Sequence, residues 1–350
     1  MWTHLDTVHY RCSDNLKSSI AGFDLDYTLI KPKGNNKFPK DKDDWRLLFN
    51  NVKQVLHQLT DHSIVIFTNQ LKYNDDICKK IDDIITELDL DITVIISSKN
   101  NHYRKPMIGM WDMLDELSNV IDLSTSFYCG DAAGRDTDFS DTDYKFAHNI
   151  GIQFRTPEEI FIGKLNKTIV PYIDLDKYIT DELPDLPKSK NDTKPELIIL
   201  IGYPASGKSY LATQFKYHII NQDTLKTRLM CLFTLKTHLA NNENIVVDCL
   251  NYKISMRGDY IQLAKQEGYY VRCVNITNDL DFCWHMNQVR TQITNGKYKL
   301  IPKVVYYTMR KHFHDPVLDE GFDQIDTYEN KIILNDNKLE RYYHFMYSNI

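Results

Sequence analysis

The sequence has few of the features that mark a secreted or membrane-bound protein. No apolar run in its 350 residues approaches the length of a bilayer-spanning helix. The first residues lack the basic and then apolar pattern of a signal peptide. The seven cysteines are odd in number and include no CxxC pair, which argues against a disulfide framework and against a zinc site. We therefore expect an intracellular protein, in the nucleus or the cytoplasm, with no membrane contact.

An excess of positive charge is also lacking. The formal net charge is −6 at pH 7, so any binding of nucleic acid would depend on local basic patches and would weaken with salt. The length exceeds that of one ordinary hydrophobic core, which favours two domains. Prolines, charges and a loss of periodicity mark a linker at 181–195. We expect a first domain at 1–180, a second at 196–350, and a monomer.

A phosphate-binding loop stands at the start of the second domain. Gly202–Ser209 matches GxxxxGK[ST] at every fixed position, after the apolar run 197–201 and before a helical stretch. A chance glycine-rich turn is the alternative, and the flanking strand and helix disfavour it. We expect Lys208 to neutralise the terminal phosphates of ATP and the Ser209 hydroxyl to hold Mg²⁺. The remaining expected phosphate-binding residues, through their backbone, are Gly202, Ala205, Ser206 and Gly207.

The first domain alternates short apolar runs with helical patterns. The runs at 20–23, 64–67, 93–97 and 126–129 read as strands, and helices are expected at about 41–59, 77–88 and 107–117. This alternation is typical of an α/β fold with a doubly wound parallel sheet. Chemistry in such sheets sits at the carboxyl ends of the strands. The polar residues that follow the strands are Asp24, Asp26, Thr68 and Asp131.

These residue types suit the transfer of a phosphoryl group. A carboxylate such as Asp24 can attack phosphorus, and a second acid, Asp26, can protonate the leaving alcohol and later activate water. Mg²⁺ held by Asp24 and Asp131 would screen the negative charge that opposes the attack. Thr68 can donate a hydrogen bond to the transferring group, and Lys105 can neutralise that group.

The same residues carry a family resemblance. The motifs Asp24-Leu25-Asp26-Tyr27-Thr28, Thr68-Asn69, Lys105-Pro106 and Gly130-Asp131 resemble those of the haloacid-dehalogenase-like (HAD-like) phosphatases. The longer stretches 21–26, 130–135 and 138–151 resemble the phosphatase half of polynucleotide kinase/phosphatases. The resemblance implies that Asp24 is the nucleophile, Asp26 the acid/base and Asp131 a metal ligand, with Asp138 and Asp143 supporting the acidic loop. We also expect Asp26 to help bind the metal and Asn69 to contact the substrate. Tyr27 departs from the family, which usually has glycine there.

The second domain resembles the kinase half of the same family. The stretches 221–225, 247–251, 285–290 and 310–322 match it in order and spacing. The resemblance implies that Asp223 is the general base for a 5′-hydroxyl and that Arg290 is the lid arginine. Asp248 either positions substrate or Mg²⁺, or caps the next turn. Lys226 and Arg257 either contact phosphate or are solvated helix charges. Two positions depart from the family: Lys226 stands where the phage relatives have arginine, and Gln222 stands where the family often has arginine.

The order of the domains, phosphatase before kinase, resembles the eukaryotic-type DNA-repair enzymes. Because the first strand begins at Ile20, we expect their N-terminal phosphopeptide-binding domain to be missing. The expected substrate is DNA with 3′-phosphate and 5′-hydroxyl ends, and the expected products are ends that a ligase can seal. Three alternatives remain open: RNA repair with the same chemistry, a small-molecule kinase fused to a metabolite phosphatase, and a nucleotide-regulated adaptor.

Overall fold

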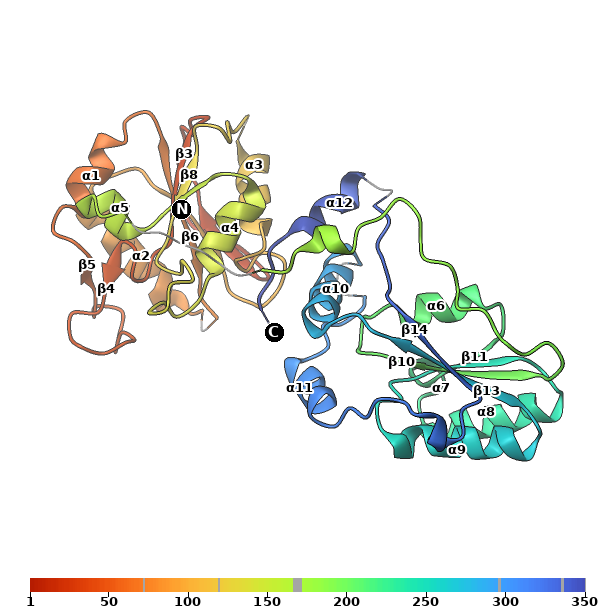
Figure 1. Ribbon diagram of the computed structural model, residues 1–350. Helices are drawn as coiled ribbons and strands as arrows, with labels where there is room; N and C mark the ends of the chain where they lie inside the picture. The colour runs from red at the N-terminus through yellow and green to blue at the C-terminus, as the bar shows by residue number, and fades with distance from the viewer. Residues whose placement is uncertain (72, 119, 166–171, 295–296, 335–336, 350) are drawn as a thin grey trace. The chain divides into compact units, whose positions relative to one another are not determined.

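A computed structural model describes the chain except for residues 72, 119, 166–171, 295–296, 335–336 and 350 (Figure 1). The chain divides into two compact units. The first holds Met1–Tyr172 and Phe345–Ser348, and the second holds Ile173–His344 and Asn349. None of the described helices has the length and apolar character needed to cross a membrane.

The boundary between the units differs from the expected one at 180. Residues 173–180 belong to the second unit because Leu175 and Tyr178 are buried against Phe282 and Tyr306. Ile179 forms a β-bridge with Ile332, which holds this stretch to the same unit. The short segment Phe345–Ser348 returns to the first unit, a feature that no local pattern in the sequence announces.

The first unit is built on a seven-stranded sheet in the order β1-β2-β7-β6-β3-β8-β9. From β7 to β9 the strands are parallel, and β1 and β2 join antiparallel at the edge. The four predicted strands are all present, each shifted by no more than two residues at an end. The strands are β1 (Thr3–Leu5), β2 (Val8–Arg11), β3 (Ile20–Phe23), β6 (Ser63–Asn69), β7 (Thr93–Ser97), β8 (Phe127–Cys129) and β9 (Gln153–Arg155).

Helices cover both faces of this sheet. One face carries α1 (Val52–Gln58), α2 (Asp75–Leu88) and α5 (Pro157–Ile162), and the other carries α3 (Gly109–Leu117) and α4 (Thr142–Ile150) (Figure 1). Burial on both faces explains why the central strands are apolar throughout rather than alternating. On the α3 and α4 face, Phe67 of β6 stacks on Trp111 with ring centroids 5.8 Å apart and meets Phe146 at 5.5 Å.

The helix expected at 41–59 is shorter than its pattern suggested. Only Val52–Gln58 is helical, and the preceding residues form a small antiparallel hairpin of β4 (Ile30–Lys31) and β5 (Arg46–Leu47). Two residues of the apolar spacing that suggested a longer helix, Trp45 and Phe49, lie outside α1 but pack against the same buried cluster. A shared core thus produced a helical period without a continuous helix.

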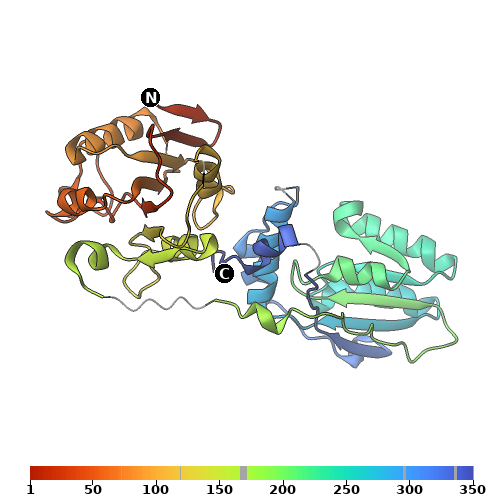
Figure 2. The same cartoon turned by 90° about the horizontal axis from the view of Figure 1, so that it is seen from above.

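The second unit is a five-stranded parallel sheet in the order β11-β12-β10-β13-β14 (Figures 1 and 2). Alternate residues of the central strand β10 face opposite layers: Leu197, Ile199 and Ile201 pack with α8 and α9, whereas Ile198 and Leu200 pack with α6. The strands are β10 (Glu196–Ile201), β11 (His218–Asn221), β12 (Ile245–Asp248), β13 (Tyr270–Ile276) and β14 (Gln324–Tyr328). The helices are α6 (Lys208–Gln214), α7 (Gln222–Leu225), α8 (Arg228–Ala240), α9 (Ile254–Gln266), α10 (Leu280–Ile293), α11 (Lys303–Lys311) and α12 (Asn337–His344).

Arg257 of α9 is part of the interior of this unit. Its side chain is fully buried and forms two hydrogen bonds to Glu320, of 2.6 and 2.7 Å, and one each to the carbonyls of Asn251 and His314. All of these partners are protein groups, so the guanidinium is not presented to a substrate. This position corrects both interpretations of Arg257 from the sequence: it neither faces solvent nor lies on the wall of a binding cavity.

The buried ion pair makes a prediction about stability. Arg257→Met should lower the free energy of unfolding by about 3–5 kcal/mol, because it leaves the buried Glu320 carboxylate without a charged partner. The exposed pair of Lys99 with Asp6 is the control, and Lys99→Met should change stability by about 0–1 kcal/mol. Urea unfolding followed by circular dichroism measures both. Unchanged stability in Arg257→Met, together with weaker substrate binding, would restore the substrate role.

Candidate active sites

The first site is centred on the ammonium group of Lys105. Its Nζ donates hydrogen bonds to Asp24 Oδ1 at 2.6 Å, to Asp143 Oδ1 at 2.7 Å and to the Tyr128 hydroxyl at 2.7 Å. Lys105 is 3% exposed, and Asp24 follows β3 at the carboxyl edge of the sheet, where Tyr128 of β8 lies alongside. Parallel strands thus bring together residues that are far apart in the sequence.

The electrostatics of this cluster favour a bound cation. Burial raises the pKa of Asp24 to about 7 against the opposing effect of Lys105, and burial together with Asp24 and Asp143 raises the pKa of Asp131 to about 8. The carboxylate oxygens of Asp24, Asp131 and Asp143 lie within 4.8 Å of one another. Three crowded carboxylates repel each other, and Mg²⁺ prefers oxygen ligands of this kind. The residues present therefore fit a magnesium site.

Asp143 has a more central position than the sequence indicated. Its carboxylate accepts hydrogen bonds from Lys105, from the Tyr128 hydroxyl at 3.2 Å and from the backbone N–H of Ala132 at 3.1 Å. The sequence pattern placed Asp143 in support of the acidic loop, and it does bind that loop at Ala132. Its contact with Lys105 depends on the approach of α4 to β8, which no local pattern reveals. Asp138 braces the same loop through the backbone N–H groups of Ala133 and Arg135.

Asp26 lies beside this cluster in a more open position. Its carboxylate accepts hydrogen bonds from Gln70 Nε2 at 2.9 Å and from Lys80 Nζ at 3.1 Å. Gln70 also donates to Thr68 Oγ1 at 2.9 Å, which links the two predicted site residues. Among the described residues, the Asp26 carboxylate is not one of the three that converge as potential metal ligands. The side-chain geometry therefore favours acid/base chemistry for Asp26 over metal binding.

Gln70 and Lys80 were not identified from the sequence. Gln70 directly follows the Thr68-Asn69 motif and could have been considered for that reason. Lys80 is a buried lysine on α2, and nothing in the local sequence distinguishes it from an exposed charged residue of a helix. Asn69 was expected to contact the substrate; its amide bonds the backbone of Lys105 in both directions, at 3.1 and 3.3 Å. Its substrate contact stays a prediction.

The backbone of the turn after Asp24 explains why glycine suits the position that Tyr27 occupies. Tyr27 has φ of +62°, in the left-handed region where glycine is favoured. A residue with a Cβ pays about 1–2 kcal/mol there. The Tyr27 hydroxyl donates a hydrogen bond to the Lys37 carbonyl at 2.6 Å, which offsets part of this cost by fixing the loop that follows.

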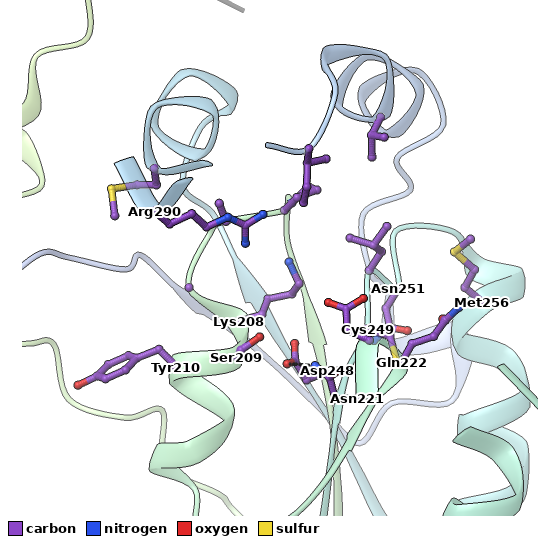
Figure 3. A pocket seen from close by; sticks show the side chains of 18 of the residues that line it. Lys208, Ser209, Tyr210, Asn221, Gln222, Asp248, Cys249, Asn251, Met256 and Arg290 are labelled. Carbon is purple, nitrogen blue, oxygen red and sulfur yellow. Dashed lines mark hydrogen bonds between the residues drawn. The ribbon is translucent and has the colours of Figure 1, made fainter. Parts of the chain in front are cut away.

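The second site is a cavity of about 690 Å³ at the carboxyl ends of β10, β11 and β12 (Figure 3). The walls come from the phosphate-loop region, the turns after β11 and β12, and the helices α9, α10 and α11. Figure 3 shows Lys208 and Arg290 extending toward the same space. The predicted residues that line the cavity are Ala205, Gly207, Lys208, Ser209, Asp223, Asp248 and Arg290.

The loop geometry requires the residues that the motif specifies. Gly207 has φ of +91°, and a Cβ there would lie 1.9 Å from Asn330 Nδ2. Lys208 Nζ donates to the carbonyls of Gly202 and Tyr203 at 2.9 and 2.6 Å, and burial lowers the pKa of Lys208 to about 8. The buried Ser206 Oγ has no hydrogen-bond partner among the described residues. A phosphate anion would favour the charged form of Lys208, so the loop fits the phosphates of a nucleotide.

The part of the cavity wall beyond the phosphate loop includes Asp223, Asp248 and Arg228. Asp223 is exposed at the start of α7, and Asp248 accepts a hydrogen bond from Asn221 Nδ2 at 2.7 Å. Asp248 therefore faces the cavity, which favours the positioning role over the turn cap. Lys226 is outside the cavity lining, and its Nζ donates to the Asp223 carbonyl at 2.6 Å. Arg228 lines the cavity instead.

Arg290 approaches the loop from α10. Its Nη2 donates to Asn287 Oδ1 at 3.1 Å, while its buried Nε has no hydrogen-bond partner among the described residues. Asn287 also donates to the Ile301 carbonyl at 3.0 Å and accepts from the Ile301 N–H at 3.2 Å. The segment that precedes α11 is thereby tied to the arginine that faces the phosphate loop.

Gly130 provides a test of the first site. A Cβ added there would lie 2.4 Å from Asp143 Cγ and Oδ2, so Gly130→Ala must displace the Asp143 carboxylate from Lys105. Hydrolysis of p-nitrophenyl phosphate should fall about 10²-fold, the scale of a misplacement of about 1 Å. Gly34→Ala is the control, because a Cβ at Gly34 meets nothing within 4 Å. Full activity in Gly130→Ala would exclude a role for the Asp143 position.

Comparison with known proteins agrees with this geometry. The family described as polynucleotide kinase 3 phosphatase matches residues 19–161. A protein of Acanthamoeba polyphaga mimivirus whose name describes a bifunctional polynucleotide phosphatase/kinase is 33% identical, over 92% of this chain and 88% of its own. The bifunctional polynucleotide phosphatase/kinase of Schizosaccharomyces pombe is 32% identical, over 93% of this chain and 83% of its own.

A solved structure from Mesorhizobium loti, described as a HAD-like phosphatase, covers 37% of this chain and 72% of its own, with 15% identity and a TM-score of 0.31. That likeness concerns the fold alone. The predicted fold class, a HAD-like α/β domain followed by a P-loop kinase domain, is confirmed. On the strength of the two full-length relatives, the chain belongs to the bifunctional polynucleotide phosphatase/kinase family of enzymes.

Proposed function

We propose that this chain heals nucleic-acid ends at DNA strand breaks. The first unit removes a 3′-phosphate, and the second transfers the γ-phosphate of ATP to a 5′-hydroxyl. The proposal is supported chiefly by the presence in one chain of two groups of charged side chains, each suited to phosphoryl transfer. One joins Lys105 to Asp24 and Asp143, and the other gathers Lys208, Asp223 and Arg290 around one cavity.

In the phosphatase reaction Asp24 is the nucleophile. Its carboxylate oxygen attacks phosphorus, the bond from phosphorus to the 3′-oxygen breaks, and Asp26 gives a proton to that oxygen. Asp26 then takes a proton from water, which attacks the aspartyl phosphate and releases inorganic phosphate. Lys105 offsets the charge on the transferring group, and the Thr68 hydroxyl donates a hydrogen bond to it. Gln70 donates one hydrogen bond to Asp26 and another to Thr68. These two bonds support the arrangement, because they hold the acid and the donor close together.

Asp24 and Asp131 would hold Mg²⁺, with Asp143 close by. The bound ion supplies positive charge that lessens the repulsion between the attacking carboxylate and the phosphate. Asp143 itself is engaged by Lys105, Tyr128 and Ala132, so its main contribution is to orient Lys105. In the second unit, the Ser209 hydroxyl would hold the metal at the ATP phosphates.

In the kinase reaction Asp223 accepts the proton of the 5′-hydroxyl as its oxygen attacks the γ-phosphorus and ADP leaves. Lys208 and Arg290 offset the charge that spreads over the transferring group. Gly202, Ala205, Ser206 and Gly207 form the loop for the ATP phosphates. Asp248 orients Asn221 and, with Arg228, shapes the acceptor side of the cavity. The products are ends that a ligase can join.

Paired variants test whether the two sites act separately. Asp24→Ala should abolish release of 3′-phosphate and leave the kinase unchanged, because the nucleophile belongs only to the first unit. Lys208→Ala should abolish ATP-dependent phosphorylation and leave the phosphatase unchanged, also when ATP is omitted. Product analysis on nicked and gapped duplexes measures both reactions. Loss of both activities from either substitution would contradict a two-site enzyme.

Matched DNA and RNA ends test the substrate class. Strands of identical sequence should be processed faster as DNA than as RNA at both sites, since the 2′-hydroxyl is the group that distinguishes them. A higher kcat/KM on RNA would favour RNA repair. Phosphorylation of free nucleosides with no gain from a longer strand would instead favour a small-molecule kinase.

A further inference from the structure

The segment Phe345–Ser348 belongs to the phosphatase unit although it follows Ile173–His344 of the kinase unit in the sequence. Phe345 is 5% exposed and Tyr347 is 2% exposed, so two aromatic rings from this segment are buried. Their ring centroids lie 6.3 Å apart. Burial of both rings makes the segment part of the interior of the first unit rather than a loose extension.

Side chains of the phosphatase unit satisfy the backbone of the segment. Tyr172 donates its hydroxyl to the Phe345 carbonyl at 3.1 Å and accepts from the Tyr347 N–H at 2.7 Å. Asn149 of α4 accepts from the Met346 N–H at 2.7 Å and donates to the Met346 carbonyl at 3.1 Å. These four bonds fix the segment along one side of α4.

Lys145 of α4 adds a charged contact. It is fully buried, and its Nζ binds Asp141 Oδ2 and the Tyr347 carbonyl, both at 2.7 Å. A buried ammonium group needs such partners, because desolvation otherwise disfavours its charge. The carbonyl of Tyr347 is therefore one of the partners that stabilise a buried lysine in the middle of α4.

The same helix connects this segment to the reacting groups. Asn149 Nδ2 also donates to the carbonyl of Pro106, at 3.0 Å, directly after Lys105. Asp143, in the first turn of α4, accepts from Lys105 Nζ at 2.7 Å. Asn149 thus joins Met346 to Pro106, and α4 joins Tyr347 to Asp143, so both routes lead to the Lys105 ammonium group.

We propose that Phe345–Ser348 is a positioning element of the phosphatase site, which holds Lys105 and Asp143 in place through Asn149 and Lys145. This inference rests on the proposed phosphatase function. It means that residues late in the sequence, after Ile173–His344, help to position the side chains of the phosphatase site. It follows that dephosphorylation depends on the presence of this late segment, whereas the kinase cavity makes no use of it.

Two variants of different kinds test this role. Tyr347→Ala removes a buried ring, and Asn149→Ala removes the bonds to Met346 and Pro106 with little loss of apolar burial. Each should lower the phosphatase kcat about 10- to 100-fold, as expected for displaced charged groups, and leave the ATP-dependent kinase rate unchanged. Turnover is measured on p-nitrophenyl phosphate and on a 3′-phosphorylated oligonucleotide, at a temperature where circular dichroism shows each variant fully folded.

Two controls separate positioning from a general loss of structure. Tyr347→Phe keeps the ring and the backbone carbonyl, and should retain much more phosphatase activity than Tyr347→Ala. Tyr343→Ala, four residues earlier, removes a partly buried ring that packs in the second unit, and should leave the phosphatase unchanged. Unchanged phosphatase turnover in both folded variants, or an equal fall in kinase rate, would overturn the proposal.

The two substrates distinguish this proposal from the function on which it rests. If the wild-type chain hydrolyses p-nitrophenyl phosphate but not a 3′-phosphate end, the assigned substrate is wrong. A loss of p-nitrophenyl phosphate turnover in Tyr347→Ala and Asn149→Ala would then still support the positioning role.

Discussion

The buried ammonium group of Lys105 is the contact on which the first unit depends. It joins the carboxylates of Asp24 and Asp143 in a site from which water is largely excluded, where charges interact more strongly than in water. An unpaired lysine or carboxylate at this position would be costly. Several distant features serve to keep this contact in place: the absence of a side chain at Gly130, the amide of Asn69, and α4 with the segment bound to it.

In the second unit, the lysine of the site is held by backbone groups of its own loop rather than by a buried salt bridge. Alternating burial along β10 fixes the strand, and the strand fixes the phosphate loop at its carboxyl end. Gly207 allows the loop to pass close to Asn330, and Arg290 reaches the loop from α10. The lysine here is held next to carbonyls of its own loop, which leaves it ready to exchange them for phosphate oxygens.

The sequence predicted those parts of both sites that depend on local order. Asp24, Thr68 and Asp131 are predictable because each lies at or just after the carboxyl end of a strand, and parallel strands end at one edge of a sheet. Lys80, Tyr128 and the C-terminal segment could not be found in this way, since their contacts join elements far apart in the chain. Arg257 is the converse case, a residue that the sequence offers as a phosphate contact but that the structure buries. Its charge is neutralised in the interior by Glu320, which lies 63 positions further along the chain.

The central claim is that Asp24 carries the phosphoryl group during dephosphorylation, within a site organised by Lys105. The most direct measurement uses an Asp26→Asn variant, in which activation of water should be slow enough for the intermediate to accumulate. A 3′-phosphorylated strand with a labelled phosphate is added, the reaction is stopped with acid, and the labelled peptide is mapped by mass spectrometry. We expect the label on Asp24. Release of labelled phosphate with no label on the protein at any time would contradict it.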